Sequence, residues 1–267
     1  RATPPVECRT PPADDQAMST LSIGLCGLGR MGGNMAKRLA RAGVRVVGYD
    51  ATPGAADALG ADGTIQPVVS LRAMVDALAT PRVAWVMVPA GAATQASIDA
   101  LADLVAPGDT IVDGGNANYK DSQRRAAALA SRGIRFVDCG VSGGVWGLEQ
   151  GYALMFGGSD EAAQAIAPYA RILAPGPERG WLHCGPPGSG HFVKMIHNGV
   201  EYGMMQAYAE GFALLEGKKD FALDVAAIAE LWRHGSVVRS WLLDLTADFL
   251  ARDAKLDGIA PHVADSG

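Results

Sequence analysis

The chain has 267 residues, of which 49% are hydrophobic and 19% are charged, and its formal net charge is −5. This length and apolar content allow one large domain or two smaller ones with a buried core. The acidic balance argues against a nucleic-acid partner and against attraction to an acidic membrane surface. Charged residues, glycine and proline interrupt every apolar run before about 18 residues, the minimum for a bilayer span. We therefore expect a cytoplasmic protein that binds a small molecule.

The four cysteines are Cys8, Cys26, Cys139 and Cys184. They form no C-x-x-C pair and show no metal-ligand spacing, so no metal site is expected. Three of them lie in or beside expected strands, which is typical of buried, reduced thiols in a cytosolic protein.

The two ends of the chain lack the patterns of folded elements. Residues 1–17 carry four prolines without hydrophobic periodicity. We expect a disordered leader over residues 1–18, with Met18 as the natural start. The last residues, up to Gly267, show neither a terminal helix nor a cap, so the C-terminal domain is expected to be truncated there.

A glycine turn separates the first expected strand, Leu21–Cys26, from the first expected helix, Asn34–Ala42. The turn reads Gly27-Leu28-Gly29-Arg30-Met31-Gly32. Gly27 permits the tight turn, Gly29 lets the backbone approach a pyrophosphate, and Gly32 lets the helix pack close to the strand. The N–H groups at the start of the helix suit phosphate oxygens. All six residues of the turn are therefore expected to bind a dinucleotide.

Asp50 ends the second expected strand, Arg45–Tyr49. A carboxylate about 20 residues after the turn accepts hydrogen bonds from the adenosine ribose, whereas the 2′-phosphate of NADP would meet like charge. Ala51 and Thr52 follow, where an NADP site would place an arginine. NAD is therefore expected over NADP. The alternative is that Asp50 only caps the following helix.

Strands and helices continue to alternate as far as Cys184. Further strands are expected at Val83–Val88, Thr110–Asp113, Ile134–Cys139, Ala153–Phe156 and Trp181–Cys184. Helices are expected near Ala55–Leu59, Leu71–Leu78, Thr94–Leu104, Tyr119–Ser131 and Asp160–Leu173. This alternation predicts a parallel sheet with right-handed crossovers.

Only helical patterns follow the last expected strand. They cover Ser189–Glu216, Ala222–Trp232 and Trp241–Arg252. The predicted fold class is α/β: a Rossmann-like, doubly wound sheet over residues 19–188, followed by an all-helical domain over residues 189–267. This helical part is short for an independent core, so its exposed faces are expected to meet a partner subunit.

Ligands of such sheets bind beyond the carboxyl ends of the strands. Two further strand ends therefore join the glycine turn in the expected cofactor cleft. They are Val88-Pro89-Ala90-Gly91 and Asp113-Gly114-Gly115-Asn116. Val88, Pro89, Ala90 and Asn116 are the cofactor contacts expected there. The alternative for Asn116 is a turn residue or helix cap.

Another glycine-rich segment, residues 140–147, follows the strand Ile134–Cys139. Without side chains on its glycines, several backbone N–H groups of this segment can donate to one ligand oxygen, and Ser142 adds a hydroxyl. This segment is interpreted as a substrate-binding loop through Ser142, Gly143 and Gly144, and the alternative is a simple connection.

One helical stripe combines four chemically different groups. Lys194, His197, Asn198 and Glu201 stand at i, i+3, i+4 and i+7 among apolar neighbours. An amine, an imidazole, an amide and a carboxylate on one face suit proton removal, binding of a substrate oxygen and proton return. The alternative is an ordinary helix with a wetted polar side.

With these motifs, residues from about Leu21 to Arg239 resemble the decarboxylating 6-phosphogluconate dehydrogenases, particularly the shorter NAD-preferring members. The motifs are the glycine turn, residues 112–116, residues 141–144 and residues 190–202. The resemblance implies that Lys194 is the general base and Glu201 the general acid. It implies substrate contacts by Asn116, Ser142, Gly143, Gly144, His197, Asn198, Tyr202 and Arg239.

The implied reaction is oxidative decarboxylation of 6-phospho-D-gluconate to ribulose 5-phosphate and carbon dioxide, with reduction of NAD. No metal is implied, and a homodimer or homotetramer is expected. Val145-Trp146 also matches the short type. In this family a second subunit and residues beyond the last one here complete the phosphate site.

Two other functions stay open from the sequence. A non-decarboxylating β-hydroxyacid dehydrogenase shares the glycine turn, the Ser-Gly-Gly loop and a lysine with asparagine four residues on, but lacks partners such as His197 and Glu201. A catalytically inactive NAD-binding protein is the second alternative.

Overall fold

The structure is a computed structural model that describes residues 21–260. The expected leader, Met18 and Cys8 lie outside these residues. The chain divides into two compact units between Lys194 and Met195.

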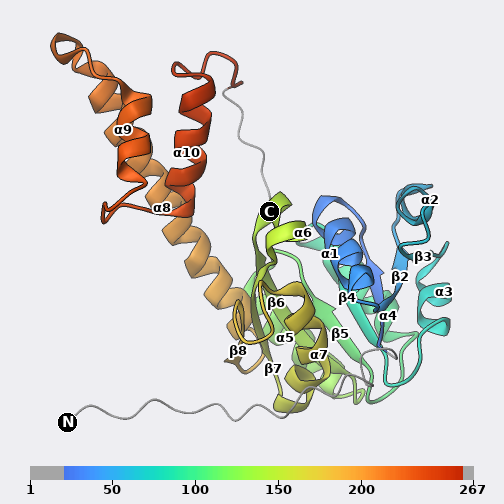
Figure 1. Ribbon diagram of the computed structural model, residues 1–267. Helices are drawn as coiled ribbons and strands as arrows, with labels where there is room; N and C mark the ends of the chain where they lie inside the picture. The colour runs from blue at the N-terminus through green and yellow to red at the C-terminus, as the bar shows by residue number, and fades with distance from the viewer. Residues whose placement is uncertain (1–20, 261–267) are drawn as a thin grey trace, which may run out of the picture. The chain divides into compact units, whose positions relative to one another are not determined.

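The first unit is built on one eight-stranded sheet (Figure 1). The strands are β1 Ser22–Cys26, β2 Arg45–Tyr49, β3 Gln66–Pro67, β4 Val83–Val86, β5 Thr110–Asp113, β6 Arg135–Ser142, β7 Ala153–Gly158 and β8 Trp181–Gly185. Their order is β3-β2-β1-β4-β5-β6-β7-β8, so the direction of strand addition reverses between β1 and β4. This reversal is the topological switch point of a doubly wound sheet.

Helices cover both faces of this sheet. Helices α1 Arg30–Arg41, α2 Ala55–Gly60 and α7 Asp160–Leu173 share one apolar core, and α3 Leu71–Asp76, α4 Ala92–Ala102 and α5 Tyr119–Ala130 share the other. Ile23 and Leu25 of β1 belong to the first core, whereas Cys26 belongs to the second. Side chains that alternate along the strands thus fill two separate apolar layers.

The strand β7 departs from the expected parallel arrangement. It pairs antiparallel with β6, with Ser142 opposite Ala153, while the other neighbouring strands are parallel. Residues 143–152 connect the two strands and hold only the short helices η2 Gly144–Trp146 and α6 Gly147–Gln150. A parallel crossover needs about a dozen or more residues, so this connection reverses the chain instead.

Several strand and helix boundaries differ from the expected ones, most by one or two residues. Strand β6 continues through Gly140 to Ser142, because these residues pair with β7. Helix α1 begins at Arg30, within the glycine turn. Strand β4 ends at Val86, and the short strand β3 was not expected.

Within residues 195–260, the second unit contains α-helices, one short 3-10 helix and a small core. Helix α8 Ser189–Gly217 continues into it, and η3 Lys219–Phe221, α9 Val225–Trp232 and α10 Trp241–Arg252 follow. Ala229, Ala247 and Leu250 are buried against Phe212 and Val225. No helix in residues 21–260 is long and apolar enough to cross a membrane.

A carboxylate sets the start of α9, three residues later than expected. Asp224 Oδ1 accepts a hydrogen bond from the Ala227 N–H at 2.9 Å, which is an N-cap contact. The preceding Ala222 has φ of 50°, outside helical geometry. The helix therefore begins at Val225.

Candidate active site

The glycine turn lies where β1 and β4 end side by side. The Met87 N–H donates to the Cys26 carbonyl oxygen at 2.7 Å, which joins the two strand ends. Gly27 has φ of +93°, and a Cβ there would lie 2.5 Å from the Met87 carbonyl oxygen. Only glycine fits this backbone conformation and this close approach.

The other two glycines of the turn meet different surroundings. A Cβ on Gly32 would lie 2.0 Å from the Gly27 carbonyl oxygen, so α1 packs directly against the turn. A Cβ on Gly29 would meet nothing within 4 Å. Gly29 immediately precedes α1, whose first N–H groups lack partners inside the helix. An open space therefore faces the positive end of this helix, as a phosphate site requires.

Asp50 joins this turn from the end of β2. Its Oδ2 accepts from the Leu28 N–H at 2.7 Å, and its Oδ1 accepts from the Thr52 N–H at 2.8 Å. Burial opposes ionisation, but these hydrogen bonds outweigh it and lower the pKa of Asp50. Gly54, rather than Asp50, occupies the N-cap of α2. Asp50 is thus a charged carboxylate beside the glycine turn, and it is not the cap of α2.

The two other expected cofactor loops also meet at the carboxyl edge of the sheet. Thr94 Oγ1 donates to the Pro89 carbonyl oxygen at 2.8 Å and holds the segment before α4. A Cβ on Gly115 would lie 3.2 Å from the Val88 carbonyl oxygen. Asn116 lies exposed in the second loop, and Asn118 caps α5. Asn116 is therefore not the helix cap.

Lys194 is buried where α8 begins. It is 9% exposed, and a Cβ on Gly140 would lie 2.3 Å from the Lys194 Cβ. A Cβ on Gly190 would lie 2.5 Å from the Asp138 carbonyl oxygen. Two glycines thus let the first turns of α8 lie directly on β6.

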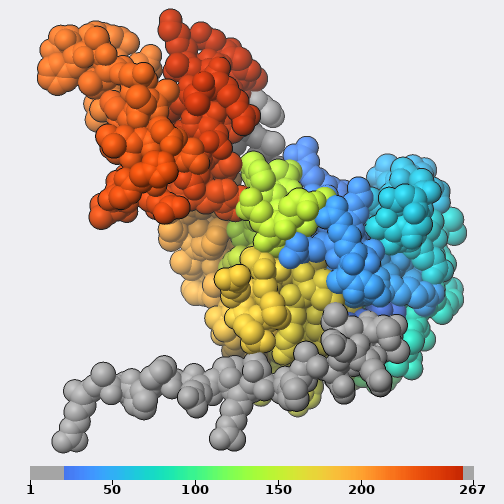
Figure 2. Space-filling view, viewed as in Figure 1, coloured from blue at the N-terminus to red at the C-terminus, as the bar shows by residue number. Residues whose placement is uncertain are grey.

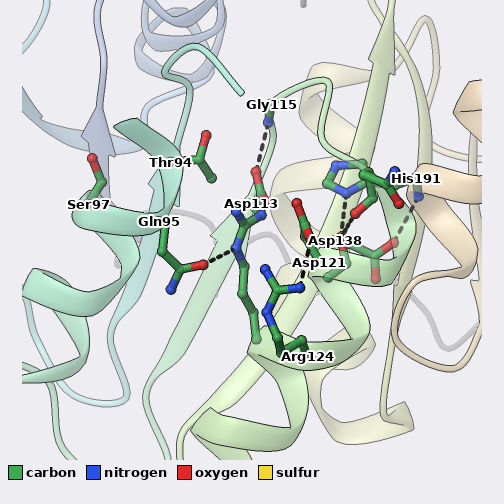
Figure 3. Close-up of polar contacts among 12 residues, drawn as sticks. Thr94, Gln95, Ser97, Asp113, Gly115, Asp121, Arg124, Asp138 and His191 are labelled. Atoms are coloured by element: carbon green, nitrogen blue, oxygen red, sulfur yellow. Dashed lines mark hydrogen bonds and ion pairs between the residues drawn. The ribbon is translucent and has the colours of Figure 1, made fainter. Parts of the chain in front are cut away.

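The carboxylate of Asp138 anchors the same helix start. It accepts from the Gly188 N–H at 2.6 Å and from the His191 N–H at 2.8 Å. Burial raises the pKa of Asp138, although these N–H donors oppose the rise. His191 is also buried, and its Nδ1 lies 2.7 Å from Ser122 Oγ (Figure 3). Sequence reasoning missed all three side chains, because their partners are distant in sequence.

The Ser-Gly-Gly segment ends β6 and opens the connection to β7. Gly143 and Gly144 have φ of +134° and +52°. Arg38 of α1 supports the following residues, donating to the carbonyl oxygens of Leu148 at 3.1 Å and Ala174 at 2.7 Å. Figure 2 shows this connection, in lime green, against the blue surface of α1. Helix α1 and the expected substrate loop are thus packed together.

The remaining expected residues belong to the second unit. His197 Nδ1 lies 3.6 Å from Glu201 Oε2, and both side chains are more than a third exposed. Asn198 is half-buried. Tyr202 and Arg239 are exposed, and the Arg239 N–H donates to the Ser236 carbonyl oxygen at 3.2 Å. Tyr208, which sequence reasoning missed, contacts the Val238 carbonyl oxygen and holds Ser240 Oγ at 2.8 Å.

The polar stripe of α8 is less exposed than the apolar residues between its members, so the apolar residues of this part of the helix are not buried as expected. Lys194, His197, Asn198 and Glu201 are among the less exposed residues of α8. The apolar neighbours Val193, Ile196 and Val200 are 38%, 51% and 58% exposed.

The cysteines match the expected reduced state within the described residues. Cys26, Cys139 and Cys184 are free thiols, and burial raises the pKa of Cys26 to about 11. Cys184 is only half-buried, contrary to the expectation of burial, because β8 is an edge strand. No cluster of potential metal ligands occurs in residues 21–260.

Two family comparisons decide the assignment. Residues 22–175 match the NAD binding domain of 6-phosphogluconate dehydrogenase, and residues 190–265 match the C-terminal domain of 6-phosphogluconate dehydrogenase. The chain belongs to the 6-phosphogluconate dehydrogenase family. It is accordingly an oxidoreductase with a domain for a nicotinamide nucleotide.

Relatives of this 6-phosphogluconate dehydrogenase family member differ in length. The NAD(+)-dependent, decarboxylating 6-phosphogluconate dehydrogenase of Haloferax volcanii is 43% identical over 91% of this chain and 80% of its own. The decarboxylating 6-phosphogluconate dehydrogenase of Aggregatibacter actinomycetemcomitans is 39% identical over 91% of this chain. The present chain spans 52% of that longer relative.

Solved structures include two kinds of dehydrogenase. The Plasmodium falciparum 6-phosphogluconate dehydrogenase, studied with NADP+ and with 6-phosphogluconate, has a TM-score of 0.80 at 28% identity, covering 86% of this chain and 51% of its own. The Mycobacterium tuberculosis 3-hydroxyisobutyrate dehydrogenase has a TM-score of 0.71 at 27% identity, covering 84% and 73%. The fold is thus common to both reactions.

Proposed function

We propose that the chain catalyses the NAD-dependent oxidative decarboxylation of 6-phospho-D-gluconate to ribulose 5-phosphate and carbon dioxide. The observation that carries this proposal is the composition of α8. It places a buried lysine at position 194 and an imidazole–carboxylate pair, His197 and Glu201, one and two turns later. A simple hydroxyacid oxidation needs a base, whereas loss of carbon dioxide also needs an acid that protonates carbon.

The glycine turn fits a dinucleotide. Space is open beside Gly29, no side chain caps α1, and Gly32 allows the close packing of the turn. Residues of the turn would hold the pyrophosphate, and Asp50 would accept from the adenosine ribose. The chemistry that a bound nicotinamide supplies is acceptance of a hydride from C3 of the sugar acid.

The proposed preference for NAD rests on charge. The lowered pKa of Asp50 keeps its carboxylate ionised at neutral pH. A 2′-phosphate at this position would meet that charge, and Ala51 offers no cation to offset it.

Lys194 is the proposed general base. A lysine acts as a base only when it is neutral, and burial disfavours the charged form of an amine. Lys194 accepts the C3 hydroxyl proton while the hydride leaves C3, which produces a β-keto acid. It returns that proton to the C3 oxygen as the carboxylate departs as carbon dioxide, leaving an enediol. Glu201 then protonates the carbon that lost the carboxylate, which gives ribulose 5-phosphate.

The other proposed substrate contacts come from both units. Asn116, Ser142, Gly143 and Gly144 stand at strand ends of the first unit. His197, Asn198, Tyr202 and Arg239 belong to the second, where Tyr202 and Arg239 are proposed to hold the phosphate end. We accordingly assign cofactor binding to residues 19–188, and substrate binding and dimer or tetramer contacts to residues 189–267.

The likeness to 3-hydroxyisobutyrate dehydrogenase supports one second candidate, oxidation of a β-hydroxyacid without decarboxylation. Steady-state formation of NADH from NAD should be compared with 6-phosphogluconate and with 3-hydroxyisobutyrate as substrates. The proposal expects a far higher kcat/KM for 6-phosphogluconate. Activity with 3-hydroxyisobutyrate alone would favour the second candidate, and binding of NAD without turnover of either would reject both.

A further inference from the structure

Helix α5 carries a buried arginine that sequence reasoning missed. Arg125 Nη1 lies 2.8 Å from Asp113 Oδ2, and these side chains are 2% and 0% exposed. Arg125 Nε also donates to Gln95 Oε1 of α4 at 2.9 Å. One guanidinium thus joins a helix, α4, to the end of a strand, β5.

Each partner of Arg125 is next to an expected ligand loop. The second oxygen of Asp113, Oδ1, accepts from the Gly115 N–H at 3.1 Å, one residue before Asn116. Gln95 follows Thr94, which holds the Pro89 carbonyl oxygen at 2.8 Å. Figure 3 shows Gln95 beside Thr94, and the dashed contact between Asp113 and Gly115.

A continuous set of polar contacts therefore runs between the two loops. We call Gln95, Arg125, Asp113 and Gly115 the loop bridge. The loops also approach directly, because a Cβ on Gly115 would lie 3.2 Å from the Val88 carbonyl oxygen. A shift of Arg125 would consequently move both loops.

A buried ion pair is weak evidence for a gain in stability, because desolvation of both charges offsets their attraction. Its geometry is nevertheless strict, since a guanidinium binds two partners in fixed directions. The loop bridge is thus better suited to fixing positions than to adding free energy.

We propose that Arg125 is a positioning residue that locks the first cofactor loop, residues 88–91, to the second, residues 114–116, which ends in the proposed substrate contact Asn116. It touches neither ligand and acts through Gln95 and Asp113. This inference rests on the proposed function, because it assigns the loops to NAD and to the sugar acid.

Arg125→Met is the first test, and Arg124→Met is its matched control. Arg124 is the preceding residue of α5, but its side chain is 68% exposed and it pairs with Asp121, at 2.8 Å. Two quantities should be measured for each variant: the rate of hydrogen exchange in both loops, and kcat and KM. The value of kcat is calculated per active site, counted by titration with NADH. Arg125→Met should speed exchange in both loops and lower kcat about 100-fold, the scale of a 1 Å misplacement. Arg124→Met should change neither.

Gln95→Met is a milder test, because it removes the acceptor of Arg125 Nε and the exposed contact of Gln95 Nε2 with Asp99 Oδ1 but leaves the Asp113–Arg125 pair in place. It should raise exchange in both loops and lower kcat about tenfold. Gln95→Glu combined with Asp99→Asn keeps the acceptor without opposing two carboxylates at 2.8 Å, so it should restore both. Asp99→Asn alone is the control and should change neither. If Arg125→Met fails to fold, the Gln95 variants decide the question alone.

Three results would overturn the proposal. One is a lower melting temperature of Arg125→Met with unchanged kcat and unchanged loop exchange. Another is an equal change of kcat and of loop exchange in the Arg124 and Arg125 variants. The third is faster exchange in only one loop of Gln95→Met. A wild-type protein inactive on 6-phosphogluconate would reject the proposed function instead, and the exchange data would still decide the role of Arg125.

Discussion

Individual side chains carry the proposed chemistry, and Lys194 is the most constrained of them. Its Cβ lies where a side chain at Gly140 would stand, so the lysine has little freedom at its base. An amine fixed at its root and buried along its length is suited to take a proton from one defined hydroxyl.

Lys194→Met should stop both NADH formation and carbon dioxide release, because it removes the group proposed to take the C3 hydroxyl proton. A loss of roughly 100- to 10,000-fold in kcat is the scale of general base catalysis. Lys219→Met is a suitable control, since the Lys219 side chain is 77% exposed. Activity of Lys194→Met within a few-fold of the control would remove Lys194 from the mechanism.

Glu201→Gln should act later in the reaction. The amide keeps the size of the carboxylate but has no proton to give to the enediol. Hydride transfer in a single turnover should therefore stay near the wild-type rate, while ribulose 5-phosphate appears more slowly. Rapid-quench analysis of both products measures the difference. Equal, mild losses in Glu201→Gln and Lys194→Met would contradict the two assigned roles.

Asp50 should determine the choice of cofactor. The pKa of Asp50 is lowered, so its carboxylate stays charged down to a more acidic pH than an ordinary aspartate does. The preference for NAD should therefore be constant from about pH 6 to about pH 9. Asp50→Asn combined with Ala51→Arg should raise kcat/KM for NADP relative to NAD at least tenfold, or about 1.4 kcal/mol. An unchanged ratio of the two constants would count against this explanation.

At the scale of the elements, close backbone approach determines where the helices begin. Helix α1 meets the glycine turn through Gly32, and α8 meets β6 through Gly140 and Gly190. The Asp138 carboxylate then accepts two N–H groups at the start of α8. These contacts set the position of Lys194 one turn later.

Gly29→Ala and Gly32→Ala should separate ligand binding from folding. A methyl group on Gly29 meets no protein atom within 4 Å, so the melting temperature should hold while the Kd for NAD rises about tenfold. A methyl group on Gly32 would lie 2.0 Å from a carbonyl oxygen, so the free energy of unfolding should fall by about 1–3 kcal/mol. Thermal denaturation and calorimetric titration with NAD measure both effects. Equal stabilities of the two variants would contradict this distinction.

Local patterns predicted most of these elements, and long-range pairing explains the differences. The glycine turn, the alternation of strands and helices, and the long helix from Ser189 are visible in neighbouring residues. Pairing of Gly140–Ser142 depends on residues 153–155, which no local pattern connects to them. The antiparallel pairing of β7 with β6 depends on the length and packing of the connection, residues 143–152.

The candidate site also contains residues that local patterns predict and residues that only long-range contacts explain. Its glycines and the stripe beginning at Lys194 follow motifs, so the sequence predicted them as candidates. Arg125, Asp138 and His191 have partners between 12 and 69 positions away in sequence. A buried charge in an amphipathic helix cannot be distinguished from a solvated one until those partners are known.

At the scale of the whole molecule, the fold is common to enzymes with different reactions. The likeness extends to both 6-phosphogluconate dehydrogenase and 3-hydroxyisobutyrate dehydrogenase. Fold alone therefore does not select the reaction. The groups on α8 make that selection in the proposed mechanism.

The expected dimer or tetramer is testable through the exposed apolar side chains of α8. Ile196→Glu should shift the protein toward monomer, because a carboxylate would be buried without a partner at a subunit contact. Val69→Glu is a control at a residue that is 90% exposed in a loop. Sedimentation velocity measures the mass of each variant. A wild-type monomer, or an unchanged assembly in Ile196→Glu, would contradict the assignment of this face.

The most direct test of the central claim is the ratio of carbon dioxide to NADH from carboxyl-labelled 6-phosphogluconate and NAD. The proposed mechanism predicts one labelled carbon dioxide for each NADH, with ribulose 5-phosphate as the remaining product. Formation of NADH with the label retained in an organic acid would contradict decarboxylation.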